Sequence, residues 1–329
     1  MSEMFTHGYA LIVGVGADLL VTIDDARGIA DLLRDPARCA YPADHVQLLT
    51  GEGARRADIL TALDKLAAQT AFDPDAAAIV YFSGHGLETP GYYLMPFSYD
   101  LADLSSTAVS GAEFTGKLRA LKAKKLLVLL DCCHAGGIGE VKGVAFAKSP
   151  TPPGLFDALG VGSGRVILAS SRKDEVSYTG KPYSVFTSAL LEALAGYGAF
   201  EYDGYARVLD AAMWLGRKVP DRTDDKQHPI VKVSNLEDNF ALAYYAAGDK
   251  QPKKLEWAVS VPSVSPGLDA AQVETWRRRL GNYRENLLLI EERMSEYVEF
   301  TAIPLQLVKS KRQTEAKIAE LEQQLGLRA

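Results

Sequence analysis

The amino-acid sequence predicts an α/β fold: a mostly parallel central sheet covered by helices on both faces, followed by a C-terminal α-helical hairpin. Two observations predict the sheet. Short apolar runs alternate with helical periodicities over the first 248 residues, and the runs have the continuous apolar character of buried strands. A third observation predicts the hairpin, because a proline-containing segment is followed by two long helical patterns.

The strands and helices of the first part are predicted from the spacing of their apolar residues. The predicted strands are residues 10–15, 46–49, 76–82, 126–130, 165–169 and 230–233. The predicted helices are residues 24–33, 56–68, 111–121, 184–194 and 205–218. Since helices connect successive strands, most neighbouring strands are expected to run parallel.

Changes in composition divide the chain into three parts. They are a body, residues 1–248, a linker, residues 249–268, and a helical module, residues 269–329. The linker contains three prolines and two adjacent lysines. In the module, Pro304 separates two helical patterns, residues 270–300 and 305–325. These patterns predict an antiparallel hairpin, which either packs on the body or forms a homodimer contact.

The overall composition excludes several classes of protein. With 329 residues, 47% hydrophobic and 24% charged, the chain is neither disordered nor collagen-like. A formal net charge of -6 argues against nucleic-acid binding through bulk electrostatics. No apolar run reaches the roughly 18 residues of a membrane span, and the N-terminus lacks the features of a secretory signal. Three cysteines cannot build a disulfide framework, which favours a reducing cytoplasm.

Two motifs follow neighbouring strands of the predicted sheet. The sequence S-G-H-G at residues 83–86 follows the third strand, and D-C-C-H-A-G at residues 131–136 follows the fourth. Active sites of open parallel sheets lie beyond the carboxyl ends of the strands, so His85 and the cysteines are expected to share one crevice. A thiol needs a base or a cationic neighbour to become nucleophilic near neutral pH, and imidazole suits that task. The motifs therefore predict nucleophilic catalysis by cysteine and histidine.

The two motifs resemble those of the caspase-like cysteine peptidases, in particular the metacaspase and paracaspase branch. Members carry an S-G-H-G motif and a D-x-C-H-[SA]-G motif, and the interval from His85 to Cys133 agrees with the roughly 50 residues of caspase-type enzymes. The resemblance covers about residues 9–247 and implies a three-layer sandwich. It also implies a cysteine endopeptidase that works through a thioester acyl-enzyme, with no cofactor required.

The resemblance assigns roles to the residues of the two motifs. It implies that Cys133, directly before the histidine of the second motif, is the nucleophile and that His85 is its base. The backbone amides of Gly86 and Cys133 are expected to form the oxyanion hole. Cys132 is interpreted as a packing residue, and Cys39 as inert. His134 is not expected to be the base, because adjacent residues of an extended chain point in opposite directions.

The resemblance also implies cleavage after arginine or lysine, selected by acidic residues. Asp25 lies in a D-D-A segment that matches one such position, and Asp131 opens the cysteine motif. Glu175 is a looser match for a third acid. Carboxylates in one pocket select a cationic side chain through charge-assisted hydrogen bonds. The alternative interpretation of Asp25 is an acid that stabilises the N-terminus of a helix.

Weaker patterns have simpler interpretations. The sequence G-V-G at residues 14–16 predicts a tight turn rather than a dinucleotide loop, since the third glycine is missing. No metal-ligand spacing and no EF-hand loop is present, so no metal is predicted, although calcium activation is left open because some metacaspases need it. Residues 140–164 form a long loop, in which Lys142 and Lys148 are hypothetical self-cleavage sites.

Two hypotheses for the function remain at this stage. The first is a peptidase that acts on proteins with Arg or Lys at the cleaved position and is regulated through its C-terminal helices. Residues 280–325 weakly resemble helical effector-associated modules, which implies an activating partner or self-association in bacterial defence or cell-death signalling. The second is a catalytically silent adaptor that uses the caspase fold for protein–protein assembly. The presence of both His85 and a motif cysteine favours the enzyme.

Overall fold

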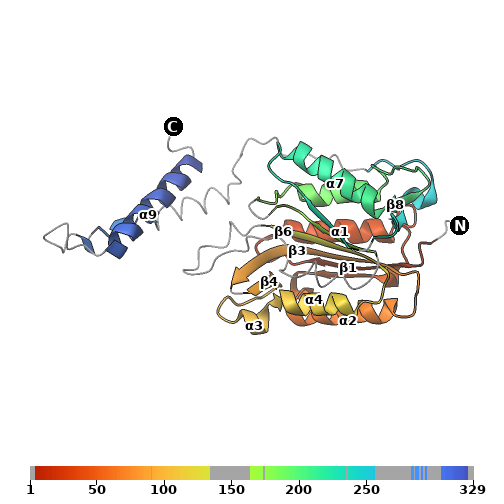
Figure 1. Ribbon diagram of the computed structural model, residues 1–329, viewed down its shortest axis with the longest axis horizontal. Helices are drawn as coiled ribbons and strands as arrows, with labels where there is room; N and C mark the ends of the chain where they lie inside the picture. The colour runs from red at the N-terminus through yellow and green to blue at the C-terminus, as the bar shows by residue number, and fades with distance from the viewer. Residues whose placement is uncertain are drawn as a thin grey trace. The chain divides into compact units, whose positions relative to one another are not determined.

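The computed structural model describes most of the first part of the chain and pieces of the second (Figure 1). The described residues are 4–89, 91–133, 164–172, 175–234, 236–255, 283–284, 286–288, 290–291, 293–294 and 305–324. The chain forms two compact units, Met1–Ser263 and Val264–Ala329. Residues 249–255, predicted to begin the linker, lie in the first unit, where Leu255 is buried and the Arg38 guanidinium donates to the carbonyl oxygens of Lys253 and Lys254.

The first unit is built on a sheet with the strand order β2-β1-β3-β6-β7-β9. These strands are β1 Gly8–Gly14, β2 Val46–Thr50, β3 Ala77–Thr89, β6 Lys125–Cys133, β7 Arg165–Ala169 and β9 Ile230–Ser234. All neighbours from β2 to β7 are parallel, whereas β9 pairs with β7 in the antiparallel sense. The prediction of a mostly parallel sheet is confirmed.

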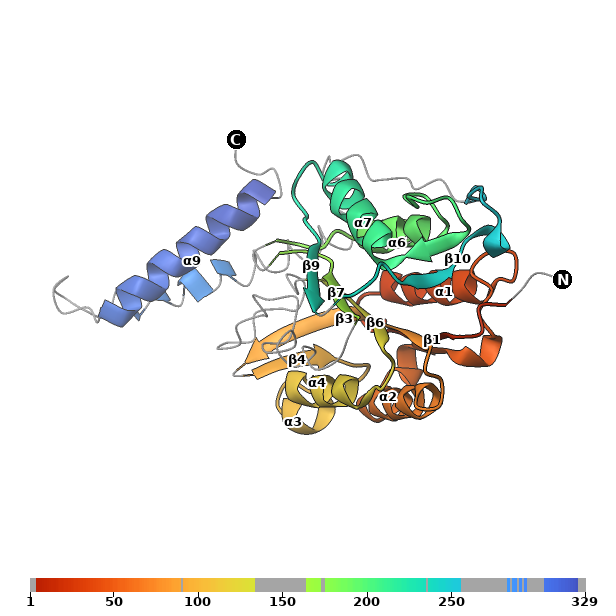
Figure 2. The same ribbon diagram turned by 45° about the vertical axis from the view of Figure 1, so that its right-hand side comes forward.

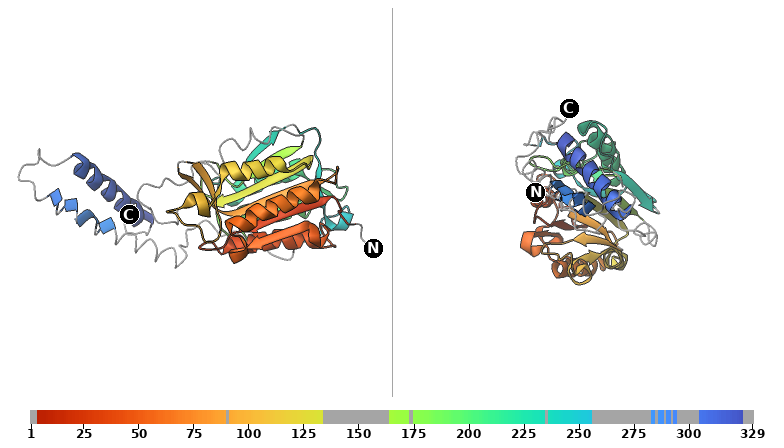
Figure 3. Two further views of the ribbon diagram at one scale, coloured as in Figure 1. Left: turned by 90° about the horizontal axis from the view of Figure 1, so that it is seen from below. Right: turned by 90° about the vertical axis from the view of Figure 1, so that its left-hand side faces the viewer.

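Helices cover both faces of this sheet (Figures 2 and 3). One face carries α1 Val21–Arg34, α6 Val185–Leu194 and α7 Val208–Arg222, and the other carries α2 Arg56–Thr70 and α4 Gly111–Ala120. Each face has its own buried apolar cluster, to which the strands contribute alternate residues. The three-layer α/β sandwich predicted from the sequence is therefore confirmed.

Several short elements extend this plan. They are α3 Leu104–Thr107, the strands β4 Gly91–Met95, β5 Val109–Ser110, β8 Tyr205–Arg207 and β10 Ala241–Tyr244, and the 3₁₀ turns Ala43–His45, Gly51–Gly53 and Ala246–Gly248. Strand β4 pairs with the last residues of β3, and β8 pairs with β10 in a separate two-stranded sheet. Such short segments show no clear periodicity, so the sequence does not predict these elements. The apolar run predicts an end of β3 at residue 82, whereas pairing with β4 carries this strand on to Thr89.

The alternation along the two central strands determines which side chains face α1 and α6. Ile79 and Tyr81 of β3 belong to the cluster under α1 and α6, whereas Phe82 belongs to the cluster under α2 and α4. Residues two apart on a strand share a face, so His85 continues the row of Tyr81. On β6, Asp131 likewise continues the row of Leu129.

The described part of the second unit is helical. Helix α9 spans Leu305–Gln324, and the described residues between 283 and 294 are also helical. The Lys311 ammonium lies 2.7 Å from a Glu291 carboxylate oxygen and joins the two segments. The predicted antiparallel hairpin and the predicted domain boundaries stay predictions. None of the described helices is both long and apolar enough to span a membrane.

Candidate active site

The two sequence motifs meet at the carboxyl edge of the sheet through the pairing of β3 with β6. The parallel register sets His85 beside Cys133 and Ser83 beside Asp131. Neighbouring strands lie about 4.8 Å apart, so the backbones of His85 and Cys133 are direct neighbours. This register brings together, in one place, the histidine and the cysteine that the sequence analysis selected.

The His85 side chain is held by a carboxylate on the neighbouring β1–α1 loop. Its Nε2 lies 3.0 Å from each carboxylate oxygen of Asp18. Its other ring nitrogen, Nδ1, is buried and has no hydrogen-bond partner among the described residues. Burial raises the pKa of Asp18, but the hydrogen bond to His85 and the charge of that ring outweigh it, so the pKa lies below its ordinary value.

Side chains pack closely against both glycines of the histidine motif. A Cβ atom on Gly86 would lie 2.6 Å from the Tyr92 hydroxyl oxygen, and one on Gly84 would lie 2.9 Å from a methyl carbon of Val15. Gly86 directly follows His85 on β3, the position from which its amide was predicted to bind an oxyanion.

Asp131 is fully buried and accepts three hydroxyl hydrogen bonds. The hydroxyls of Ser177, Ser184 and Thr187 donate to it at 3.0, 2.6 and 3.3 Å. Burial raises the pKa of Asp131, while the bonds from Ser184 and Ser177 partly oppose that effect. The carboxyl group of the cysteine motif is therefore an interior group, tied to the start of α6.

Asp25 is also fully buried, and Ser184 joins it to Asp131. The Ser184 backbone N–H donates to Asp25 Oδ1 at 2.8 Å, while the Ser184 hydroxyl donates to Asp131. Asp25 Oδ2 is buried without a hydrogen-bond partner among the described residues. Burial, and then the charge of Asp131, raise the pKa of Asp25 well above its ordinary value. Asp25 therefore faces the interior of the first unit.

Glu175 lies in a different set of contacts from this pair. Its carboxylate accepts the His228 backbone N–H at 2.7 Å and the Arg172 backbone N–H at 3.2 Å, and it lies 2.7 Å from His228 Nδ1. Although partial burial opposes it, these hydrogen bonds lower the pKa of Glu175. The structure thus brings Asp25 and Asp131 together and joins Glu175 to His228.

The other two cysteines, Cys132 and Cys39, have free thiols in the interior of the first unit. Cys132 is buried, and burial raises the pKa of its thiol to about 12. Cys39 is buried as well, and its thiol lies 3.7 Å from the Leu194 carbonyl oxygen. A buried thiol with a raised pKa is a poor nucleophile, which agrees with the packing role expected for Cys132 and the inert role expected for Cys39. The predictions for His134, Lys142 and Lys148 concern residues outside the described part of the chain.

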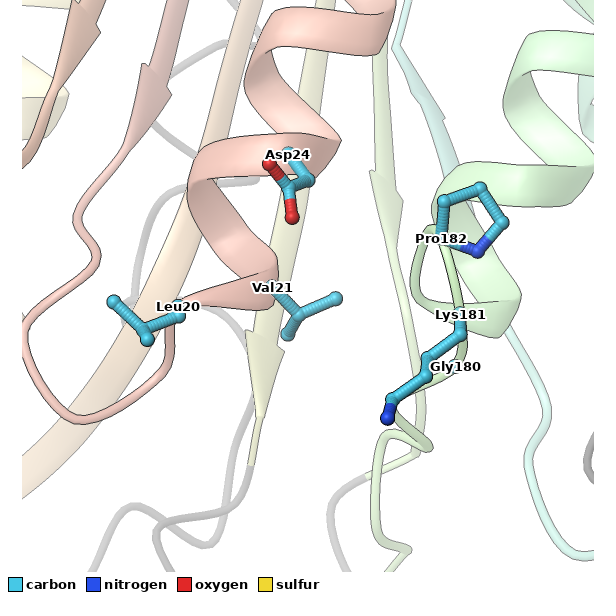
Figure 4. Close-up of a pocket in the computed structure, with 6 residues that line it drawn as sticks. All are labelled: Leu20, Val21, Asp24, Gly180, Lys181 and Pro182. Carbon is cyan, nitrogen blue, oxygen red and sulfur yellow. The ribbon is translucent and has the colours of Figure 1, made fainter.

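A surface hollow of about 570 Å³ lies between the start of α1 and the segment before α6 (Figure 4). The hollow is lined by Leu20, Val21, Asp24, Gly180, Lys181 and Pro182. Asp24 directly precedes Asp25, and Pro182 lies two residues before Ser184. Both segments that line the hollow therefore lead directly, in sequence, to residues of the buried carboxylate pair or to Ser184, which bonds to it.

Three of the residues that hold the site were not selected from the sequence. Asp18 contacts His85, and Ser177 and Gln227 form a buried chain of hydrogen bonds that ends at Asp131. Asp18 follows the first predicted strand by a few residues. The rule that active sites lie beyond the carboxyl ends of parallel strands could therefore have indicated it. Ser177 and Gln227 carry no such signal. Within the described residues, no group of three His, Cys, Asp or Glu side chains is placed to hold a metal ion.

The raised pKa of Asp25 makes a prediction about stability. A carboxyl group with a raised pKa in the folded state favours folding below its ordinary pKa and loses that contribution as the pH rises through the raised value. We expect Asp25→Asn, which keeps an acceptor for the Ser184 amide, to be more stable than the wild type at pH 8 by about 1 kcal/mol or more. The gap should close toward pH 4.

Urea unfolding at both pH values measures this difference, and Asp31→Asn on the exposed side of the same helix is the control. Equal destabilisation by Asp25→Asn at pH 4 and pH 8 would contradict the prediction, because it would make Asp25 a simple structural acceptor.

Comparison with known proteins identifies the family of the chain. A comparison with curated proteins returns no match. Among solved structures, a structural-genomics target from Geobacter sulfurreducens matches with 16% identity and a TM-score of 0.47, covering 72% of this chain and 96% of that one. The family model of the caspase domain, peptidase family C14, matches residues 7–241, which include both motifs and every strand of the central sheet. The chain therefore belongs to the caspase-domain family of cysteine peptidases.

Proposed function

We propose that the protein is a cysteine endopeptidase that cleaves proteins after arginine or lysine, with Cys133 as nucleophile and His85 as base. The observation that carries the specificity is the buried carboxylate pair, Asp25 and Asp131, at the same edge of the sheet as His85. The described contacts of the pair come from hydroxyl and amide groups and include no cationic side chain.

The electrostatics of this pair favour a cationic ligand. Two ionised carboxylates in the interior repel each other and lose hydration, and both effects raise the pKa of Asp25. A substrate guanidinium or ammonium would offset that charge and give Asp25 Oδ2 a donor. Aspartate at the cleaved position would add a third negative charge, which the pair disfavours.

The substrate side chain must reach groups that are now covered. Ser177 and Ser184, which bond to the pair, flank in sequence the residues 180–182 that form one wall of the surface hollow (Figure 4). We infer that the side chain enters at this hollow and that the segment between the two serines shifts to admit it. Asp24, on the opposite wall, adds negative charge at the entrance. Glu175 is not assigned to this pocket.

The proposed reaction uses the groups at the strand ends. The Cys133 thiol gives its proton to His85, and the sulfur attacks the scissile carbonyl carbon. The amides of Gly86 and Cys133 bind the resulting oxyanion. The C–N bond breaks as His85 returns the proton to the leaving amine, which leaves a thioester on Cys133. Water, deprotonated by His85, then hydrolyses the thioester and restores the thiol.

A panel of fluorogenic peptides that differ in the cleaved residue tests the specificity. We expect cleavage after Arg and Lys and not after Asp, and no cleavage by Cys133→Ala. Asp25→Asn should lower kcat/KM for the Arg peptide roughly 10- to 150-fold, the value of one lost charge-assisted hydrogen bond. Asp31→Asn, a change of the same kind on the same helix, should leave kcat/KM unaltered.

Two results would contradict the proposal in different ways. Cleavage after Asp alone would overturn the acidic pocket while leaving the peptidase in place. If no peptide of the panel were cleaved under any condition of activation, the result would instead favour the caspase-fold adaptor.

We further propose that the helical tail regulates the peptidase, as in an effector of bacterial defence or cell-death signalling. The support is the separate compact unit, Val264–Ala329, in which Lys311 pairs with Glu291. A chain that ends at residue 268 should differ from the full chain in oligomeric state or in peptidase activity. Light scattering coupled to gel filtration measures the first and the Arg peptide the second; no difference in either would refute a regulatory tail.

A further inference from the structure

The loop between β1 and α1 has a conformation fixed by its own hydrogen bonds. Gly16 adopts a φ of 74°, in the left-handed region that favours glycine, and Ala17 follows with a φ of 56°. The Gly16 N–H donates to the buried Thr22 hydroxyl at 2.8 Å, and that hydroxyl donates to the Leu19 carbonyl oxygen at 2.8 Å. The Leu19 N–H in turn donates to the Gly16 carbonyl oxygen. These hydrogen bonds therefore fix the backbone position of Asp18.

The contact between Asp18 and His85 determines where the neutral imidazole carries its proton. Both carboxylate oxygens lie 3.0 Å from Nε2, and an ionised carboxylate can only accept. The proton must therefore lie on Nε2, which leaves Nδ1 as the ring atom with a free lone pair. The lowered pKa of Asp18 keeps this carboxyl group ionised at neutral pH.

The second ring nitrogen, Nδ1, is the one that is left to act as a base. Nδ1 is buried and has no partner among the described residues, and the next strand places Cys133 beside His85. The His85 side chain is 7% exposed, whereas that of Asp18 is 49% exposed. The burial of the ring limits its rotation, so the hydrogen bond to Asp18 selects the tautomer as well as the orientation.

We propose that Asp18 is a positioning residue for His85: it holds the proton on Nε2 and so makes Nδ1 the atom that accepts the Cys133 thiol proton. This proposal rests on the proposed peptidase function. During acylation the proton moves from sulfur to Nδ1 and then to the leaving amine, so His85 is transiently an imidazolium. Asp18 keeps its negative charge throughout, and its hydrogen bond from Nε2 stabilises that cation.

A second histidine–aspartate pair provides a matched control. His7 Nδ1 lies 3.0 Å from both carboxylate oxygens of Asp73, in the same bidentate arrangement as His85 with Asp18. His7 directly precedes β1, and its carbonyl oxygen accepts the N–H of Ala77 at the start of β3. This pair therefore lies at the opposite edge of the sheet, and Asp73→Asn makes the same chemical change away from the site.

Nitrogen NMR of the full-length Cys133→Ala protein reports the tautomer without requiring activity. The chain has five histidines, and a His85→Gln spectrum assigns the His85 signals. We expect a protonated Nε2 and an unprotonated Nδ1, a mixture of tautomers after Asp18→Asn, and no change of the His85 signals after Asp73→Asn. A proton on Nδ1 with Asp18 present, or a tautomer left unchanged by Asp18→Asn, would overturn the proposal.

Kinetics with the Arg peptide provide the second readout. Asp18→Asn should lower kcat roughly 10- to 100-fold and change KM by no more than about twofold. This loss is smaller than the ~10⁴-fold loss of kcat for a buried triad aspartate, because Asp18 is half exposed. Asp18→Glu, which keeps a carboxylate, should retain more activity than Asp18→Asn. A loss confined to KM, or no loss, would contradict the positioning role. If the wild type cleaves nothing, the proposed function fails, and the NMR result still decides the role of Asp18.

Discussion

The parallel pairing of β3 with β6 is the interaction on which the rest of the site depends. Its register sets His85 beside Cys133 and Ser83 beside Asp131. A shift of one residue would turn every side chain of β6 to the other face, because side chains alternate along a strand. Apolar residues buried under both layers of helices hold the register, since Leu129 and Leu130 belong to opposite clusters. The packing of the core thus fixes the relative positions of His85 and Cys133.

The two buried carboxylates are unfavourable for the stability of the folded chain. Asp25 and Asp131 lie in a region where ionised groups are costly, and the described structure pairs neither with a cation. Ser184 explains how the fold tolerates them, because one residue caps α6 through Thr187 and also donates to both acids. An arrangement that is unfavourable without a ligand, and favourable with a cationic one, is typical of a binding pocket.

The sequence predicted the parts of the structure that depend on local pattern. The apolar runs identified the central strands, and the rule for the carboxyl edge of a parallel sheet brought the two motifs together. The sequence did not predict β4, which is short. It also did not predict the buried hydrogen bonds of Ser177 and Gln227, which connect segments distant in the chain. Asp18 was missed for another reason, since a single aspartate in a turn has no distinctive spacing. The contact of Glu175 with His228, 53 residues away in the chain, likewise has no local signal in the sequence, and the role predicted for Glu175 in substrate binding stays a prediction.

We propose that one cysteine of the three acts as the nucleophile of a pocket for basic side chains. Covalent labelling with an arginyl chloromethyl ketone, followed by intact-mass and peptide mass spectrometry, tests this proposal most directly. We expect one adduct per chain, on Cys133, that does not form with the aspartyl reagent and is lost in His85→Ala. An adduct on Cys132 or Cys39, or equal labelling by the aspartyl reagent, would contradict it.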